Sequence, residues 1–163
     1  RSSDLTAKQN TQNFRSKSLY RSIWAIDRKR LTGRAHLKTL GKYYVSDLGF
    51  RNYVLGYREI EPTHALENAV YNELRARGYK VDIGKNNDYE IDFVARKTDS
   101  VAYYQVSYSA AQKETLEREL RAFKNLADNY PRYLITMDRD FVSDINGVKK
   151  LWAPEWFLEG SGV

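Results

Sequence analysis

The order of apolar patterns between residues 62 and 152 is the feature that most restricts the fold. An amphipathic helix is expected to begin at Pro62-Thr63 and to end at Gly78, and a second is expected over about Lys113–Ala127. The remaining patterns are extended and predict the strands Tyr79–Ile83, Tyr89–Ala95, Val101–Tyr108, Tyr133–Met137 and Val148–Trp152. Helix, three strands, helix and one or two further strands together predict an α/β fold with a mixed central sheet flanked by helices.

Turn residues and connection lengths predict how these strands pair. The strands over Val101–Tyr108 and Tyr133–Met137 are separated by a helix, so they are expected to be parallel with a right-handed crossover. The polar stretch Gly84–Asp88 and the segment Lys97–Ser100 predict hairpins between the earlier strands. Asn146-Gly147 predicts a turn into the last strand.

The first part of the chain predicts a separate hairpin and a short helix. Strands are expected at Leu19–Ile26 and at Lys42–Ser46, with Thr32-Gly33 supplying a turn between them. Asp47 is expected to cap a helix from Leu48 to Val54. We therefore divide the chain into a basic N-terminal arm and hairpin, residues 1–42, and a main domain, residues 43–163.

Charge supports this division. Residues 1–42 hold 11 Lys and Arg against two Asp, whereas the remaining 121 residues hold 16 Lys and Arg against 19 Asp and Glu. A basic segment on a mildly acidic body is typical of an arm that binds polyanions, since each cation on a phosphate releases a counterion. The expected nucleic-acid contacts are Arg28, Lys29, Arg30, Arg34 and Lys38. The alternative is a solvated terminus with no binding role.

Composition excludes several classes of protein. The chain has no cysteine, which removes disulfides, thiolate catalysis and cysteine-bound zinc or iron–sulfur centres. It has no apolar run long enough to span a membrane and no apolar leader, so we expect a cytoplasmic protein without a membrane partner. The G-x-x-x-x-G-K-[ST] motif is absent, so ATP hydrolysis by this chain is not expected.

Acidic and amide side chains from three consecutive elements predict a site. Residues i and i+2 of a strand share a face, so Glu90 and Asp92 are expected to point one way, and Ile91 and Phe93 the other. A hairpin with the next strand would bring Asp92 close to Gln105. Glu67 lies at the margin of the apolar face of the preceding helix, from which its carboxylate can reach the sheet.

Oxygen ligands of this kind suit Mg²⁺, which can activate water and stabilise charge on a phosphodiester. The expected metal ligands are Glu67, Asp92 and Gln105, and Mg²⁺ is the expected cofactor. The alternative for each residue taken singly is an ordinary solvated side chain. His36 and His64 lack catalytic partners at a recognised spacing, and the tyrosine pairs at 43–44 and 103–104 are expected mainly to pack rather than to stack on bases.

The same residues carry a resemblance to a known family. The chain resembles the C-terminal domain of unknown function that follows the AAA-type ATPase module in many bacterial and archaeal ATPases, a domain similar to the PD-(D/E)XK nuclease superfamily. The resemblance extends from about residue 20 to residue 159 and rests on these segments: Leu37–Asn52, Leu66–Leu74, Arg77–Tyr79, Glu90–Ala95 and Tyr104–Ser109.

This resemblance implies a restriction-endonuclease-like α/β core with Glu67, Asp92 and Gln105 at the metal positions. Ser107 stands where the superfamily pattern has a lysine, and Gln105 replaces the more usual acidic ligand. Loss of a positive charge at such a position commonly costs about 10²–10³ in rate. A lysine from a neighbouring element could replace it, and the candidates are Lys85, Lys113 and Lys124.

Three functions follow from these observations. The leading interpretation is a nuclease-like accessory domain of a prokaryotic ATPase that binds nucleic acid or a partner through a degenerate metal site. The second is an active Mg²⁺-dependent DNase. The third is a purely protein-interacting, regulatory module for an upstream ATPase. The catalytic candidates are Asp92, Glu67, Gln105, Glu90 and Lys85.

Overall fold

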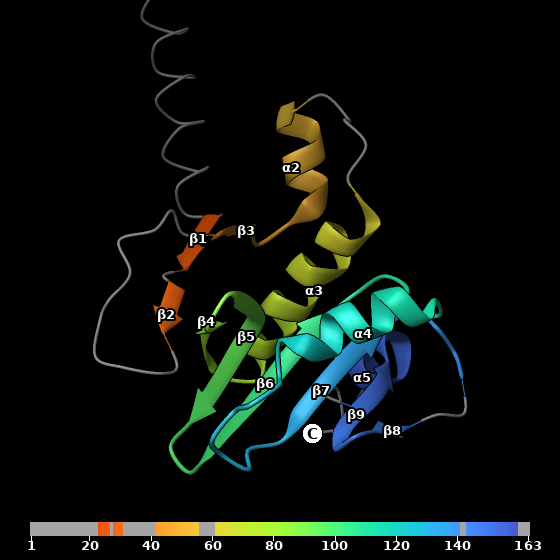
Figure 1. Ribbon diagram of the computed structural model, residues 1–163. Coiled ribbons are helices and arrows are strands. Elements are labelled where there is room, and N and C mark those ends of the chain that lie inside the picture. The colour runs from red at the N-terminus through yellow and green to blue at the C-terminus, as the bar shows by residue number, and fades with distance from the viewer. Residues whose placement is uncertain (1–22, 27, 31–41, 56–60, 141–142, 160–163) are drawn as a thin grey trace, which may run out of the picture.

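The computed structural model describes residues 23–26, 28–30, 42–55, 61–140 and 143–159. The helices are α2 (Leu48–Leu55), α3 (Pro62–Ala76), α4 (Lys113–Arg121) and α5 (Ala153–Glu159). The strands are β1 (Ile23–Ile26), β2 (Arg28–Arg30), β3 (Lys42–Val45), β4 (Lys80–Asn86), β5 (Tyr89–Lys97), β6 (Ser100–Val106), β7 (Arg132–Thr136), β8 (Asp144–Ile145) and β9 (Val148–Trp152). The arrangement is shown in Figure 1.

A seven-stranded mixed sheet forms the centre, in the order β2-β4-β5-β6-β7-β9-β8. Strands β4, β5 and β6 form an antiparallel meander, while β7 runs parallel to both β6 and β9. The predicted parallel pairing across α4 is therefore confirmed. Helices flank this sheet, as expected of the predicted α/β class.

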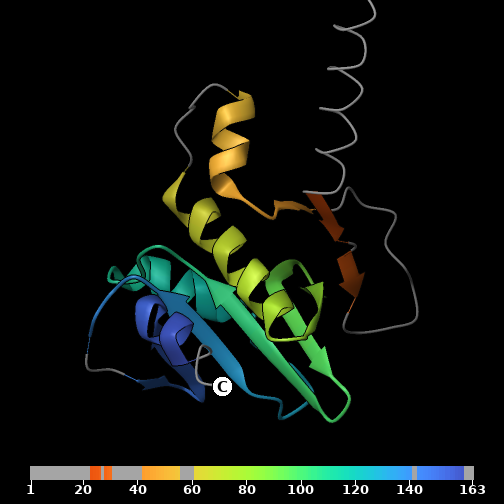
Figure 2. The same cartoon turned by 180° about the vertical axis from the view of Figure 1, so that it is seen from behind.

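Two apolar clusters lie on opposite faces of the sheet. The cluster under α3 and α5 includes Val70, Leu74, Phe93 and Trp156. The cluster under α4 includes Phe123 and other buried side chains from the sheet: Ile91, Val94, Leu134 and Val148. Figure 1 shows α4 in front of the sheet, and the view from behind in Figure 2 brings α3 and α5 forward.

Helix boundaries follow local capping. Pro62 opens α3, and the carboxylate of Glu61 accepts a hydrogen bond from the backbone N–H of His64 at 3.0 Å. Asp47 accepts the backbone N–H of Phe50 at 3.0 Å, which confirms its predicted role as the cap of α2. Helix α4 ends at Arg121, earlier than predicted, and Asn125 soon afterwards adopts a left-handed conformation with φ of 61°.

Part of the predicted N-terminal arm belongs to sheets. Strand β1 pairs antiparallel with β3, as the predicted hairpin requires, whereas β2 pairs in parallel with β4 at the edge of the main sheet. The predicted boundary after Lys42 falls within β3. The predicted turn at Thr32-Gly33 lies outside the described residues.

A β-bulge interrupts β5 where it crosses the acidic motif. Asp82 is paired with Val94 and Gly84 with Ile91, so two residues of β5, Asp92 and Phe93, lie opposite the single residue between them on β4. The expectation that Ile91 and Phe93 share a face is wrong, since these side chains enter different clusters.

Among the residues described, no helix combines the length and apolar character needed to cross a lipid bilayer.

Candidate functional site

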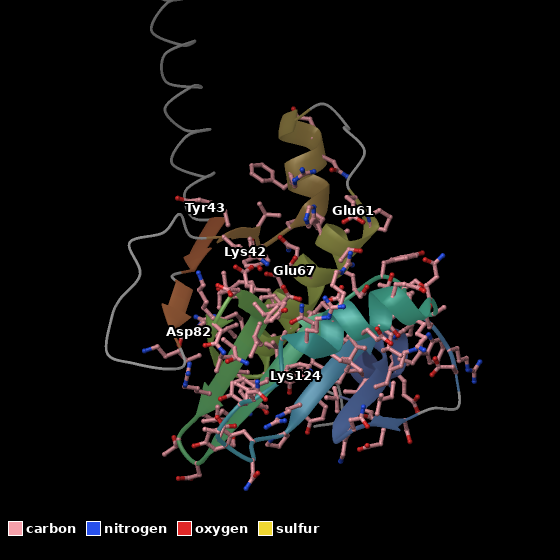
Figure 3. All side chains as sticks on the ribbon, viewed as in Figure 1. Lys42, Tyr43, Glu61, Glu67, Asp82 and Lys124 are labelled. Atoms are coloured by element: carbon pink, nitrogen blue, oxygen red, sulfur yellow. The ribbon has the colours of Figure 1, made fainter. Side chains whose placement is uncertain are left out.

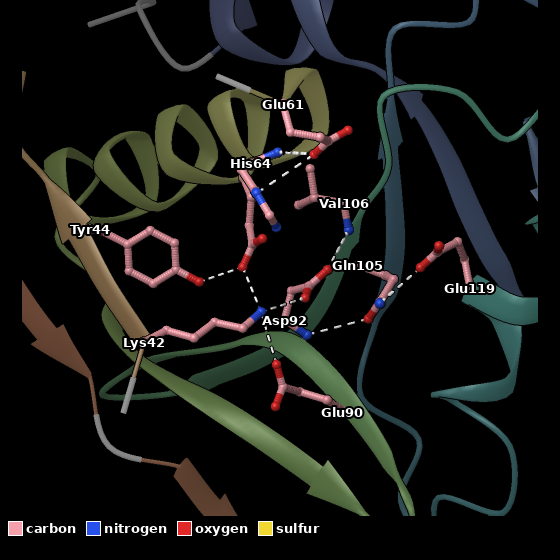
Figure 4. A network of polar contacts seen from close by, with 10 residues as sticks. Lys42, Tyr44, Glu61, His64, Glu90, Asp92, Gln105, Val106 and Glu119 are labelled. Carbon is pink, nitrogen blue, oxygen red and sulfur yellow. Dashed lines mark hydrogen bonds and ion pairs between the residues drawn. The ribbon is translucent and has the colours of Figure 1, made fainter. Parts of the chain in front are cut away.

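Three carboxylates converge on the ammonium group of Lys42. The Nζ atom lies 2.7 Å from Glu67 Oε1, 2.8 Å from Glu90 Oε1 and 3.2 Å from Asp92 Oδ1. The carboxylates come from α3 and β5, and the lysine comes from the first residue of β3 (Figure 4). We call these four residues the Lys42 cluster.

Strand β3 is held against α3 by side-chain amides. The Asn68 side chain accepts the Val45 N–H at 2.9 Å and donates to the Val45 carbonyl at 2.8 Å, and Asn72 donates to the same carbonyl at 3.0 Å. These bonds provide partners for the backbone N–H and carbonyl of Val45, as a neighbouring strand would. They hold Lys42 beside Glu67, which lies in the second turn of α3.

Tyr44 connects the Lys42 cluster to the apolar core. Residues i and i+2 of a strand share a face, so Tyr44 points the same way as Lys42. Its ring stacks on Tyr71 with centroids 4.6 Å apart and lies near Phe93, while its hydroxyl donates a hydrogen bond to Glu67. Burial and the negative charge of Glu67 raise the pKa of Tyr44 far above its ordinary value, so it remains a donor.

Asp92 is anchored by the neighbouring strand. Its Oδ2 accepts the backbone N–H of Val106 at 2.9 Å, which leaves Oδ1 directed at Lys42. Its own N–H donates to Gln105 Oε1 at 3.3 Å. Gln105 Nε2 in turn donates to Glu119 of α4 at 2.9 Å. The predicted proximity of Asp92 and Gln105 is confirmed, although the Gln105 amide is engaged with Glu119 on the α4 side.

The electrostatics of the Lys42 cluster are dominated by excess negative charge. Burial and the nearby charge of Glu67 raise the pKa of Asp92 to about 7, against the opposing effect of Lys42. Burial alone would lower the pKa of Lys42, but Asp92 and Glu67 outweigh it and raise that pKa above its ordinary value. Lys42 therefore stays protonated throughout the physiological range.

Lys42 is the residue that sequence reasoning missed as a member of the site. The sequence places Lys42 in the basic arm, and the expected replacements for a lysine at position 107 are Lys85, Lys113 and Lys124. Two signals pointed to it: Lys42 shares a strand face with Tyr44, and it lies within the first segment of the family resemblance.

The three expected lysines differ in their positions. Lys85 is half-buried on β4, and the backbone register places it opposite Glu90. Lys113 makes an exposed ion pair with Glu117 within α4 at 3.9 Å. Figure 3 shows Lys124 well apart from Lys42 and Glu67.

Ser107 is buried, and its hydroxyl donates to the Ser109 carbonyl at 3.0 Å. His64 is exposed, with Nδ1 3.7 Å from Glu61 Oε2. Tyr44, Tyr103 and Tyr104 are buried, as their expected packing role requires, whereas Tyr43 is 67% exposed.

The expected nucleic-acid residues fall partly on β2. Arg30 pairs in register with Lys85, and Lys85 pairs with Glu90, so one row of backbone positions leads from β2 to the site. Arg28 and Lys29 occupy the preceding positions of β2. Arg34, Lys38 and His36 lie outside the described residues.

The carboxylate oxygens of the Lys42 cluster suit a hard divalent cation, both as a type of ligand and in their charge. Three carboxylate oxygens surround one point, and one ammonium cannot neutralise three carboxylates. Among the described residues, no three His, Asp or Glu side chains already form a group arranged to hold a metal ion. The two observations agree if Lys42 occupies the point of convergence, so that a bound ion would require Lys42 to move aside.

Comparison with known proteins places the chain in a family. Residues 63–153, more than half of the chain, match the family described as a domain of unknown function (DUF4143). The chain belongs to this family. A relative, an uncharacterized protein of Haemophilus influenzae, is 35% identical over 129 residues, which cover 79% of this chain. The chain spans 32% of that relative's length. No solved structure matches.

Proposed function

We propose that this domain is a divalent-metal-dependent phosphodiesterase of the nuclease type, related to the PD-(D/E)XK superfamily, in which Lys42 supplies the amine absent at position 107. The observation that carries the proposal is the convergence of Glu67, Glu90 and Asp92 on Lys42. Ser107 was the reason to expect a degenerate site, and a lysine reaching the same carboxylates from β3 removes that reason.

Lys42 acts in this proposal as a permanent positive charge that stays beside the carboxylates when it moves aside for the ion. Its raised pKa makes it unsuitable as a general base near neutrality, because a base must be unprotonated to accept a proton. A protonated ammonium can instead stabilise the negative charge that develops on a phosphodiester in the transition state. Tyr44 supports this role by holding Glu67 in place through its hydroxyl.

Glu67, Glu90 and Asp92 are the residues that would hold a divalent ion, with Mg²⁺ as the expected metal. Carboxylates are the ligands that Mg²⁺ prefers, and a second cation would offset the excess negative charge of the cluster. When bound, such an ion activates water and stabilises charge on the phosphodiester. Gln105 contributes by fixing the backbone of Asp92 rather than as a free ligand.

Nucleic acid is the substrate class that we infer for this site. The cationic sequence of β2 lies on the sheet edge, and its register row runs through Lys85 to Glu90. Cations beside an acidic site can hold the phosphates that the carboxylates alone would repel. Because each contact between a cation and a phosphate releases a counterion, such binding is expected to weaken as the salt concentration rises.

The first test is nicking of supercoiled plasmid with Mg²⁺ or Mn²⁺ by the full chain and two lysine variants. We expect Lys42→Ala to lower the rate by about 10²–10³, because it removes one preorganised charge. Lys113→Ala, which removes an exposed lysine of α4, should retain wild-type activity. Circular dichroism and melting curves of both variants separate loss of chemistry from loss of fold.

Two results would contradict the proposal. One is the absence of nicking by the wild-type chain on plasmid, linear duplex and single-stranded substrates with either metal. The other is nicking that persists unchanged in Asp92→Asn, which would assign the activity to a contaminant.

A second candidate is a non-cleaving accessory module for an ATPase, as the family resemblance implies. The observation favouring it is that Lys42 already makes ion pairs with all three carboxylates, so the cluster can be held together without a metal. The relative's greater length leaves room for other modules in that protein. Calorimetry that detects no binding of Mn²⁺ by the wild-type chain would favour this candidate over the first.

A further inference from the structure

A cavity of about 530 Å³ adjoins the Lys42 cluster and shares two of its residues. The residues that line it come from β3, from α2 and from the first part of α3 and the residue before it. Its lining includes Lys42, Tyr43, Arg51, Glu61, His64 and Glu67. We call this space the α2–α3 groove.

The side chains of the α2–α3 groove differ from those of an apolar binding pocket. Lys42 and Glu67 join the groove to the site, and Arg51 adds a second permanent cation from α2. Tyr43 follows Lys42 on β3 and is 67% exposed, although the neighbouring Tyr44 is buried. An exposed aromatic side chain and two cations in the lining of one groove form a combination that binds single-stranded nucleic acids, in which bases stack on aromatic rings and cations hold the phosphates.

We infer that the α2–α3 groove binds one unpaired nucleotide next to the scissile phosphate, so that the substrate of this domain is a single strand or a single-stranded end. This inference rests on the proposed function for the position of the scissile phosphate. Tyr43 stacks on the base, and Arg51 contacts the phosphate that follows the one at Lys42.

The size and depth of the site favour an unpaired nucleotide over a duplex. Glu67 lines the groove with a side chain that is only 8% exposed, so a phosphate must enter the groove to approach its carboxylate. A volume of about 530 Å³ lies within the range of small-ligand pockets and accommodates one nucleotide. A base that remains paired in a duplex cannot leave the helix to stack on Tyr43 without the cost of unstacking.

Glu61 allows a test of whether the groove binds a negatively charged ligand. Its carboxylate lines the cavity and its pKa is lowered by the backbone N–H groups of His64 and Thr63, so it is ionised at neutral pH and repels phosphate. Glu61→Gln keeps an oxygen that can accept the N–H of His64 while removing the charge. Binding should therefore tighten in Glu61→Gln and weaken in Arg51→Ala, a pair of opposite effects that a purely structural role would not produce.

The experiment measures binding without cleavage. Fluorescence anisotropy with EDTA present is used to titrate the full chain into labelled 12-nucleotide single strands of DNA and of RNA, and into a blunt hairpin of the same DNA sequence. We expect either single strand to bind more tightly than the hairpin, and Tyr43→Ala to weaken that binding about tenfold through loss of base stacking. The DNA and RNA arms identify which single strand is preferred.

Matched controls are available on neighbouring elements. Tyr53 on α2 is 65% exposed, yet it does not line the groove, so Tyr53→Ala should bind like the wild type. Arg121 on α4 lines a different cavity and serves as the control for Arg51. Equal weakening by Tyr43→Ala and Tyr53→Ala overturns the inference.

The remaining outcomes distinguish the inference from the proposed function. If single-strand binding depends on Tyr43 but no nicking is seen, nucleotide binding in the groove is supported and the proposed phosphodiesterase activity is contradicted. If duplex DNA is nicked and the rate is unchanged in Tyr43→Ala, phosphodiesterase activity is supported and nucleotide binding in the groove is overturned. Competition by polyglutamate equal to that of the oligonucleotide, with no effect of Tyr43→Ala, would show that the groove takes an acidic peptide and would also overturn the inference.

Discussion

Lys42 contacts three carboxylates, and a single ammonium leaves this small group of side chains with surplus negative charge. The surplus falls most heavily on Asp92, which is buried and close to Glu67, and it raises the pKa of that carboxyl to about 7. A proton or a metal ion can each relieve it. The same surplus therefore links the stability of the domain to pH and to cation binding.

The pH dependence has a definite sign. Because the pKa of Asp92 is raised from its ordinary 3.8 to about 7 in the folded protein, its contribution to stability is complete below pH 4 and is lost as the pH rises through 7. We expect Asp92→Asn to remove this loss, which is on the order of a few kcal/mol in the free energy of unfolding. Lys42 stays charged over this range and adds no slope.

Urea unfolding at intervals between pH 4.5 and pH 8.5, with EDTA present, measures this effect. The difference in free energy of unfolding between Asp92→Asn and the wild type should grow in favour of the variant as the pH rises. A difference that stays constant over this range would show that Asp92 is already ionised at the lowest pH.

Among the helices and strands, the elements with strong local signals match the sequence expectations best. Pro62 and the cap at Glu61 account for the start of α3, and the parallel pairing of β6 with β7 follows from the helix between them. Strict alternation failed at Asp92, because a bulge inserts one extra residue in β5. A bulge depends on the pairing of two strands, so the sequence of one strand does not reveal it.

The hairpin between β8 and β9 allows a local test. Asn146 and Gly147 both adopt positive φ, 55° and 80°, as the two central residues of a type I′ turn must. A Cβ at Gly147 would meet no atom within 4 Å, so Gly147→Ala changes only the backbone preference. We expect it to lower the free energy of unfolding by about 1–2 kcal/mol.

Gly147→Asn is the matched variant, because asparagine tolerates the left-handed conformation better than alanine does. It should recover most of the stability lost in Gly147→Ala, as measured by thermal or urea unfolding. Equal losses in the two variants would mean that the glycine is needed for space rather than for its backbone conformation.

Across the entire fold, the Lys42 cluster joins segments that are distant in sequence. Lys42 is separated from Glu67 by 25 residues and from Asp92 by 50. A cation held by Glu67, Glu90 and Asp92 would bind the folded chain and not the unfolded one, because only folding brings these carboxylates together. Such binding stabilises the fold by about 2.7 kcal/mol when the ion is at 100 times its Kd.

We therefore expect Mn²⁺ to raise the melting temperature of the wild-type chain by several degrees and EDTA to reverse the effect. Lys113→Ala should respond like the wild type, whereas Asp92→Asn should respond weakly or not at all. Differential scanning calorimetry gives the measurement. An equal rise in wild type and Asp92→Asn would indicate binding of the ion elsewhere.

The sequence by itself determined the α/β class, most element positions and the acidic residues at the site, because helix periodicity, capping and strand alternation are local properties. It also identified Ser107 as a departure from the pattern. Only the tertiary structure decided that the lysine beside those carboxylates comes from position 42. That contact depends on Asn68 and Asn72 holding the edge of β3 against α3, and a contact between distant segments leaves no periodic signal in either one.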